Sequence, residues 1–422
     1  MLIEFSVSNF RSIKEMQTLS FVATAMNEHE DTHVFQANEK TRLLKSVAVY
    51  GANGSGKSNL IKALMAMFNF IKYSFKDEEV GMKVMETFML DDEYLDKDIF
   101  FQIIFILEGK KYRYGFTYRN NKINSEWLFG HIRRNEVELF TRDYQDINLN
   151  ENSFKDSTKL NIRNLEKELI DNNLLLNLYA TFGGVISKSI KRYFEYNYII
   201  SLGVADSRFA RSSYEYLKDD KTKKDIIEFL NKADVGIENI IIEEEKVKND
   251  LKEMLKNITQ RNEKGDLIDI VEMKVSSFRQ KNNSAESKKF DFEKNESEGT
   301  KKLLNFSGVI TDSINNSKIL FLDEFDARLH PIITREIIKL FNSRENKSAQ
   351  LCFITHDTNL LDKDMLRRDQ IYFTEKNLKS ETSLYSLAEI KAVRNDASFE
   401  KDYIKGKYGA IPFVKNLNSI FE

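Results

Sequence analysis

Three short apolar runs stand out along the chain, because each one ends at a glycine-rich or polar segment. They occupy residues 47–50, 319–322 and 350–355. A strand that is buried on both faces shows such a continuous run, whereas a half-exposed strand alternates apolar and polar positions. We therefore predict three buried strands, and the polar residues that follow them become candidates for chemistry.

Between residues 60 and 71 the apolar positions have the spacing of one helix face. The next apolar segments have the character of strands. Residues 99–107 and 111–118 flank Glu108 and Gly109, a pair that favours a hairpin turn. Residues 126–129 and 137–140 continue a β-rich layer.

The segment 141–268 is more polar and more charged, and its pattern predicts helices at 160–170, 226–230 and 246–258. No apolar heptad continues over several turns, so a long coiled coil is not expected. We predict an N-terminal lobe at 1–140, a helical insertion at 141–268 and a C-terminal lobe at 269–422. The insertion is a candidate for dimerisation, partner binding or sensing.

The composition is that of a globular protein. Of 422 residues, 41% are hydrophobic, and 64 basic residues nearly balance 66 acidic ones. This balance gives no general electrostatic reason to expect nucleic acid or a membrane as a partner. Cys352, the only cysteine, lies in an apolar run, and Glu4 and Arg11 interrupt the N-terminus too early for a secretory signal. Since no apolar run is long enough to cross a bilayer, we expect a cytoplasmic protein.

The segment after the first apolar run matches the phosphate-binding sequence G-x-x-x-x-G-K-S in full, between a predicted strand and a predicted helix. Its glycines let backbone N–H groups approach phosphate oxygens, and the helix N-terminus adds its positive dipole end. Lys57 is expected to reach the β- and γ-phosphates, and the Ser58 hydroxyl to bind Mg²⁺. The predicted nucleotide-binding residues of this loop are Gly51, Asn53, Gly54, Ser55, Gly56, Lys57, Ser58 and Asn59.

The second apolar run ends at two adjacent carboxylates, Asp323 and Glu324. Adjacent acids at the end of a buried strand are unfavourable unless a cation or a reaction needs them. Nucleotide hydrolysis needs such a pair, one acid to hold Mg²⁺ and one to polarise water. A charged turn is the alternative for the pair alone. Together with the phosphate-binding loop, the pair predicts a metal ligand at Asp323 and a catalytic acid at Glu324.

Two further features are weak separately and stronger in combination. His356 follows the third apolar run, where an imidazole can hydrogen-bond a γ-phosphate or the attacking water. Ser297 and Gly299 form a Ser-x-Gly turn before a helical segment, and a helix N-terminus can hold phosphate. Their order along the chain, with respect to the phosphate-binding loop and the two acids, favours a shared function.

This series of features, with Asp326 in the turn after the two acids, resembles the heads of ABC-type ATPases, as in SMC-like, RecF-like and OLD-like proteins. The opening residues 1–16 resemble the first strand of those heads, with Arg11 in the usual place. Residues 323–331 and the tail at 393–412 resemble the AAA-type ATPases of bacterial abortive-infection defence operons, the AbiL/RloA-like group related to the ATPase of PARIS systems.

The resemblance implies an α/β fold with an ABC-type P-loop head, made of a mixed sheet with flanking helices and a β-rich lobe, and a helical insertion. It also implies that ATP with Mg²⁺ lies between two copies of the chain. The residues that would act on the nucleotide of their own subunit are Lys57, Ser58, Asp323, Glu324 and His356, and Arg11 is a further candidate for nucleotide binding. Ser297 and Gly299 would face the nucleotide of the other subunit, and Asp326 would couple the two sites.

Two departures from the family pattern concern the nucleotide site. Residues 297–300 read Ser-Glu-Gly-Thr, whereas transporters have Ser-Gly-Gly-Gln. No glutamine occupies the place that normally ends the strand after the P-loop helix, since Gln102 lies inside an apolar run.

The function that the resemblance implies is slow, regulatory ATP hydrolysis in an anti-phage defence system. The expected partners are a second copy of the chain, a toxic effector protein from the same operon and a phage trigger protein. The alternatives are a RecF-like or SMC-like DNA-repair clamp and a nucleotide-gated scaffold with incidental hydrolysis. Basic patches at 188–192 and 221–224 give weak support for direct DNA binding, because nearby acids dilute their charge.

Overall fold

The computed structural model describes residues 1–74, 84–132, 135–159, 171–201, 207–246, 271–391, 393 and 398–412. The chain divides into two compact units. Unit 1 comprises Met1–Val204, Ser313–Ala327 and Pro331–Glu422, and unit 2 comprises Ala205–Asp312 and Arg328–His330. Among the described residues, no helix combines the length and the apolar sequence that crossing a membrane requires.

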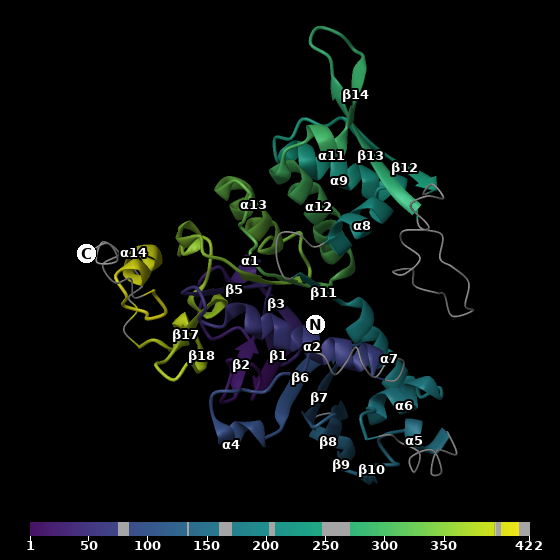
Figure 1. Cartoon of the computed structure of the whole chain (residues 1–422), viewed down its shortest axis with the longest axis vertical. Coiled ribbons are helices and arrows are strands. Elements are labelled where there is room, and N and C mark those ends of the chain that lie inside the picture. Colours follow the sequence, from purple (N-terminus) through teal and green to yellow (C-terminus); the bar gives the residue numbers. More distant parts are fainter. Residues whose placement is uncertain are drawn as a thin grey trace. The chain divides into compact units, whose positions relative to one another are not determined.

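A six-stranded sheet forms the centre of unit 1, with the order β11-β15-β16-β5-β17-β18 (Figure 1). Its strands are β5 (Ser46–Gly51), β11 (Tyr198–Ser201), β15 (Ile319–Leu322), β16 (Gln350–Ile354), β17 (Ile371–Lys376) and β18 (Thr382–Ser386). All neighbours are parallel except β17 and β18. The three predicted buried strands are confirmed as β5, β15 and β16, which are adjacent and buried throughout.

The second large sheet of unit 1 is antiparallel and has the order β10-β9-β8-β7-β6-β1-β2. Its strands are β1 (Leu2–Ser8), β2 (Gln17–Ser20), β6 (Ile99–Leu107), β7 (Lys110–Arg119), β8 (Lys122–Ile132), β9 (Asn135–Asp143) and β10 (Asp146–Leu149). The predicted hairpin is confirmed: Leu107 pairs with Lys110, and Glu108 and Gly109 have φ of 50° and 75°. Such left-handed pairs are typical of two-residue hairpin turns. A separate hairpin consists of β3 (Val34–Asn38) and β4 (Thr41–Leu44).

Helix α2 (Lys57–Tyr73) contacts both large sheets. The ring of Phe70 packs on Phe116 of β7 with centroids 5.4 Å apart, and the ring of Phe68 packs on Tyr198 of β11 at 4.3 Å. The apolar positions predicted to form one helix face, from Leu60 to Ile71, are all buried. The core of unit 1 is therefore organised around the helix that starts at the phosphate-binding loop.

The remaining helices of unit 1 are mostly short. They are α1 (Glu30–His33), α4 (Asp92–Leu95), α5 (Asp156–Lys159), α6 (Leu175–Thr181), α7 (Val185–Tyr196), α13 (Pro331–Phe341) and α14 (Phe399–Ile404), with 3₁₀ helices η3 (Thr358–Leu360), η4 (Arg368–Gln370) and η5 (Leu387–Glu389).

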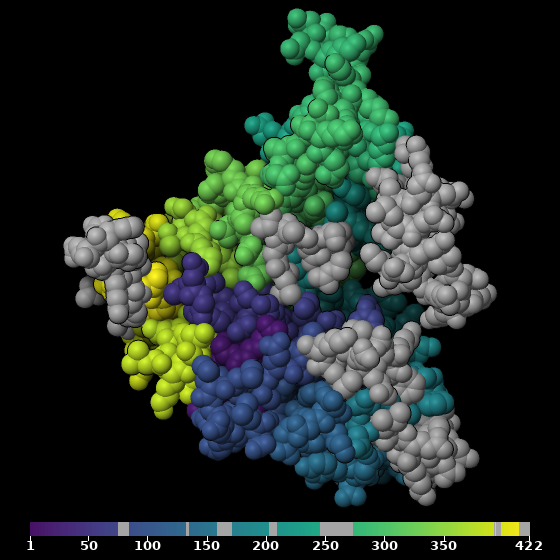
Figure 2. Space-filling model, in the orientation of Figure 1, coloured from purple at the N-terminus to yellow at the C-terminus, as the bar shows by residue number. Residues whose placement is uncertain are grey.

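Unit 2 contains helices and a three-stranded antiparallel sheet. The helices are α8 (Ser207–Tyr216), α9 (Asp220–Lys232), α11 (Phe292–Asn295) and α12 (Glu298–Asn316), whose last four residues count with unit 1; the strands are β12 (Asn239–Lys246), β13 (Val271–Gln280) and β14 (Ser287–Asp291). The tip of the β13–β14 hairpin projects from the rest of this unit (Figures 1 and 2). The helix predicted around residues 226–230 is confirmed as α9.

The boundaries of the units differ from the predicted lobes. The segment between residue 141 and β11 packs within unit 1, and β11 joins the central sheet beside β15. The compact insertion begins near residue 205, and it holds a sheet that the helical pattern did not predict. The helices expected at 160–170 and 246–258 lie outside the described residues, except for Lys246, which is the last residue of β12.

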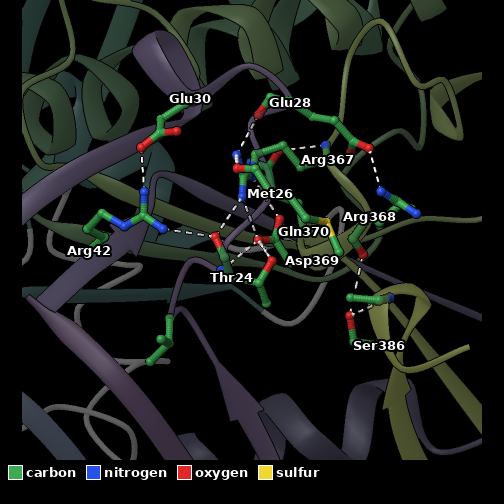
Figure 3. A network of polar contacts seen from close by, with 12 residues as sticks. Thr24, Met26, Glu28, Glu30, Arg42, Arg367, Arg368, Asp369, Gln370 and Ser386 are labelled. Atoms are coloured by element: carbon green, nitrogen blue, oxygen red, sulfur yellow. Dashed lines mark hydrogen bonds and ion pairs between the residues drawn. The ribbon is translucent and has the colours of Figure 1, made fainter. Parts of the chain in front are cut away.

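The buried ion pair between Arg367 and Asp369 connects the segment 367–370 to the segment 24–28 within unit 1 (Figure 3). Arg367 is fully buried, and its guanidinium donates to both carboxylate oxygens of Asp369, at 2.9 and 2.7 Å. It also donates to the carbonyls of Met26 and Glu28, and the amide and hydroxyl of Thr24 donate to Asp369. A buried guanidinium is stable only when its donors are paired in this way.

The replacement Arg367→Ala should lower the free energy of unfolding by about 3–5 kcal/mol, because it leaves the Asp369 carboxylate buried without its counter-charge. Urea denaturation followed by circular dichroism measures the loss. Arg344→Ala is the matched control: Arg344 and its partner Asp31 are 72% and 81% exposed, so the loss should be less than about 1 kcal/mol. Equal losses in the two variants would contradict the role of the buried pair.

Candidate nucleotide-binding site

Strand register gathers the predicted site of unit 1 at one sheet edge. Leu322 of β15 lies opposite Phe353 of β16, and Ile354 of β16 lies opposite Val49 of β5. Parallel strands in register end at the same edge. The two acids after β15, His356 after β16 and the glycine-rich loop after β5 therefore emerge together.

The phosphate-binding loop has the backbone geometry that its glycines predict. Gly56 has φ of 106° at the N-cap of α2, and Lys57 is the first residue of the helix. The Lys57 ammonium donates to the carbonyls of Gly51, at 2.8 Å, and Ala52, at 3.0 Å. The lysine side chain thus folds back over its own loop, so its charge lies where the loop would receive phosphate.

Two threonines on β17 and β18 pack directly against this loop. A Cβ atom added at Gly56 would lie 2.2 Å from Thr382 Oγ1, and one at Gly51 would lie 2.4 Å from the carbonyl oxygen of Thr374. The hydroxyls of Ser55 and Thr374 are 2.6 Å apart, and Thr382 Oγ1 donates to the carbonyl of Ser55 at 2.9 Å. Both glycines are therefore required by close packing as well as by their backbone angles.

The loop is also attached to the segment after β1. The hydroxyls of Thr382 and Ser12 are hydrogen-bonded to each other at 2.8 Å, and the Asn59 amide donates to Ser12 Oγ at 2.7 Å. Asn59, predicted as a nucleotide ligand, thus braces α2 in this structure. Arg11, also predicted as a ligand, has φ of 52° and pairs with Glu86 at 2.8 Å. Short motifs do not identify Ser12, Thr374 or Thr382 as part of the site, because their contacts join distant residues, as Ser12 and Thr382 are 370 positions apart.

The acidic pair occupies a tight turn after β15. Asp323 is 7% exposed and accepts a hydrogen bond from the amide of Glu324 at 3.0 Å. Glu324 is exposed and has φ of 50°, a left-handed backbone that costs a non-glycine residue roughly 1–2 kcal/mol. Phe325 anchors the turn: it is fully buried, and its ring lies 5.3 Å from that of Phe353. The turn therefore keeps Asp323 buried and leaves the next residue, Glu324, exposed.

The charged groups of this edge influence one another. Burial lowers the pKa of Lys57 to about 8, and the charge of Asp323 opposes this shift. Burial and then the Lys57 charge lower the pKa of His356, while Asp326, Asp323 and Glu324 act in the opposite direction. These mutual effects show that Lys57, the acids and His356 form one electrostatic site, with His356 mainly neutral at pH 7.

The oxygen atoms predicted to bind Mg²⁺ fit that ion. Mg²⁺ prefers hard oxygen ligands, such as a carboxylate and a hydroxyl. Within the described part of the chain, neither Ser58 Oγ nor Asp323 Oδ2 is engaged by another side chain or amide. Both oxygens are therefore available for a cation that accompanies a nucleotide.

The Ser-x-Gly segment belongs to unit 2, where it begins helix α12 as predicted. The exposed Ser297 caps the helix, since its hydroxyl accepts from the amide of Thr300 at 3.1 Å. The unusual acid Glu298 is paired with Arg328 at 2.9 Å and with Lys301 at 3.1 Å. A Cβ atom at Gly299 would lie 3.0 Å from the carbonyl oxygen of Arg328. Arg328 thus links the turn after the acids to the start of α12.

Gln102 takes part in the antiparallel sheet, as its position in an apolar run suggested. Its side-chain oxygen accepts from Trp127 Nε1 at 3.2 Å and from Arg113 at 3.4 Å.

A phosphate-binding loop at the start of a helix, two acids after the neighbouring strand and a strand-end histidine on a mixed sheet define a P-loop nucleotide-binding fold. The chain belongs to the family described as "AAA domain, putative AbiEii toxin, Type IV TA system", whose model matches residues 46–362, about three quarters of its length. The membership confirms the general prediction of an AAA-like P-loop ATPase domain.

Solved structures with a similar arrangement include the SMC head domain from Thermotoga maritima, with 12% identity and a TM-score of 0.42, covering 91% of this chain and 98% of that one. Another is the Smc head domain from Pyrococcus furiosus with an extended coiled coil, bound to the C-terminal domain of ScpA. It has 12% identity and a TM-score of 0.41, covering 96% and 98%. No curated protein matches the chain.

ATP affinity should fall as the pH rises above about 8, because the free protein then loses the Lys57 charge that attracts phosphate. The decline should approach about tenfold per pH unit well above this pKa. Titration calorimetry between pH 6.5 and 9.5, in buffers of different ionisation enthalpy, should also detect proton uptake on binding at pH 8–9.

Lys57→Met is the control for this titration. This variant removes the titrating ammonium group and keeps a side chain of similar length. Its residual ATP affinity should therefore not decline between pH 8 and pH 9.5. A pH dependence shared by both proteins would assign the effect to another group.

Proposed function

We propose that the chain binds and hydrolyses ATP at a composite site formed by two copies, and that this cycle controls a separate toxic effector in bacterial anti-phage defence. The convergence of Lys57, Asp323, Glu324 and His356 at one sheet edge is the observation that carries the enzymatic part. Family membership supports it, because the shared domain is an AAA domain.

In the proposed reaction, Lys57 neutralises the terminal phosphates and Glu324 orients a water molecule and accepts its proton. His356, whose pKa is lowered, stays neutral and hydrogen-bonds the γ-phosphate or that water. Asp323 and Ser58 would hold Mg²⁺, which when bound offsets the negative charge of the phosphates. Asp326 acts on the same histidine electrostatically, which supports its assignment as the link between sites.

Ser297 and Gly299 are assigned to the nucleotide of the second copy. One chain carries one phosphate-binding loop and one copy of the segment 297–299, so a symmetric pair completes two sites. The Glu298 carboxylate would repel phosphate, but its pairing with Arg328 and Lys301 supplies opposing charge. An exposed helix N-terminus with a neutralised acid is compatible with phosphate binding.

The defence role is inferred from two sources. The sequence resembles ATPases of abortive-infection operons, and the description of its family names a toxin and a type IV toxin–antitoxin system. In this proposal the rate of ATP hydrolysis sets how long an assembly holds the effector before releasing it. A phage protein triggers the release.

Two inactive variants should restore activity when mixed. A Lys57→Ala subunit still offers Ser297, and a Ser297→Arg subunit still offers its loop, so each mixed dimer has one intact site. With random mixing, half of the dimers are mixed and half of their sites work, which predicts about a quarter of wild-type ATP turnover. Phosphate release from co-refolded or co-expressed chains measures the recovery.

The matched control for this mixture is Lys57→Ala with Glu324→Gln. Both residues are assigned to the nucleotide of their own subunit, so neither site of a mixed dimer is intact and activity should stay absent. Equal recovery in the two mixtures, or none in either, would contradict the composite site.

Cells that carry this chain and the adjacent open reading frame should resist a phage that plates normally without them. Lys57→Ala and Glu324→Gln should abolish the protection, whereas Lys379→Ala, at an exposed turn, should retain it. Plaque counts at equal expression levels measure the effect. Full protection by both site variants would contradict control by ATP, and protection by the chain alone would contradict a separate effector.

A further inference from the structure

Unit 1 contains a cavity of about 850 Å³ that belongs to no part of the proposed ATP site. It lies between the β3–β4 turn, the β6–β7 turn and the strands β8 and β9, with Ile186 of α7 completing the wall. A cavity of this volume matches the size of small-molecule and cofactor sites.

Its rim is basic. Lys40, Lys110 and Lys111 line the cavity, against one acid, Glu39. None of the three lysines forms an ion pair with another described residue, although most other lysines of the β-rich layer and its loops, such as Lys14, do. The three lysines outnumber Glu39 and Glu108, the two acids in the same turns, so this concave surface keeps a net positive charge that attracts anions.

Other neighbouring acids are already occupied. Glu136, on which Lys111 and His131 act, is paired with Arg113 at 2.9 Å. Asp156 accepts hydrogen bonds from the first amides of α7, from Val185 to Ser187, at 2.7–3.1 Å. Glu39 and Glu108 offset part of the positive charge, which leaves an excess of one lysine for an anion, and the N-terminus of α7 does not contribute.

The wall of the cavity is partly aromatic and apolar. Tyr112 lines it, with its ring stacked on Phe105 at 5.6 Å and held by Gly130, where an added Cβ would lie 3.3 Å from the tyrosine ring. The Tyr112 hydroxyl has no hydrogen-bond partner among the described residues, and burial raises its pKa, so it remains a donor. Leu139 supplies further apolar surface.

We propose that this cavity binds an unpaired nucleotide, either free or as part of a single strand. Phosphate oxygens would meet Lys40, Lys110 and Lys111, and the base would pack against Tyr112. A basic groove with aromatic side chains is the usual combination for single-stranded nucleic acid. Bases within a duplex are stacked and paired, so they cannot reach the wall of a cavity without being extruded.

The basic patch at 188–192 is not part of this site. It lies on α7, where the adjacent aromatic residues Tyr193 and Phe194 are buried in the core of unit 1 and cannot stack on bases.

The test uses the full chain carrying Lys57→Ala, so that the phosphate-binding loop does not take up the ligand. Fluorescence anisotropy with a fluorescein-labelled oligodeoxythymidylate of about fifteen nucleotides should show salt-dependent binding. Adding Lys110→Glu and Lys111→Glu should weaken binding at least about tenfold, since two phosphate contacts become repulsive. Tyr112→Leu should weaken it about fivefold or more through loss of stacking.

The matched control adds Lys376→Glu and Lys379→Glu, an equal charge change at exposed positions of β17 and the following turn. It should bind like the parent. Displacement of the strand by thymidine monophosphate would identify a single nucleotide as sufficient, and displacement only by unlabelled strand would identify the strand as the ligand. Absence of binding by the parent, equal weakening in both charge variants, or unchanged binding by a folded Tyr112→Leu protein would overturn the proposal. None of these results depends on ATP hydrolysis.

Discussion

Parallel pairing of β15, β16 and β5 is the constraint on which the site depends. The register from Ile319 opposite Gln350 to Ile354 opposite Val49 ends three buried strands at one level. A slip of one residue would turn every side chain of a strand to the other face, so the packing of both faces fixes this register. The charged groups are placed at the edge of the sheet, where the strands leave the core, and the apolar runs that precede them supply the stability that holds them there.

The loop itself is held by contacts that no short motif encodes. Its left-handed glycines are compatible with many conformations, and hydroxyl groups select one of them. Thr374 and Thr382 form hydrogen bonds with Ser55, and the Ser12 hydroxyl forms hydrogen bonds with Thr382 and Asn59. The phosphate-binding loop is therefore fixed by two strands of the central sheet and by the segment after β1. Such second-layer support is what keeps a binding site in a productive geometry.

Features encoded by local pattern could be predicted, and features created by distant contacts could not. The apolar runs identified β5, β15 and β16 because burial on both faces leaves a direct trace in the sequence. Tyr198–Ser201, by contrast, is a four-residue strand that exists because β15 offers it an edge. The sheet of unit 2 could not be predicted because it also depends on pairing between strands. Strand β12 carries Glu243, Glu244 and Glu245, and a charged segment forms a strand only when partner strands pair with it. The contacts of the Ser12, Thr374 and Thr382 hydroxyls with the loop produce no recognisable pattern in the sequence.

The turn after the two acids carries two residues with left-handed backbone angles within five positions of the chain. It starts at Glu324, with φ of 50°, and contains a second left-handed residue, Arg328, with φ of 65°. Glu324 belongs to unit 1 and Arg328 to unit 2, where Arg328 pairs with Glu298 at the start of α12. Two strained residues so close together allow few alternative conformations between them. The backbone of this turn is therefore closely constrained at both of its left-handed residues.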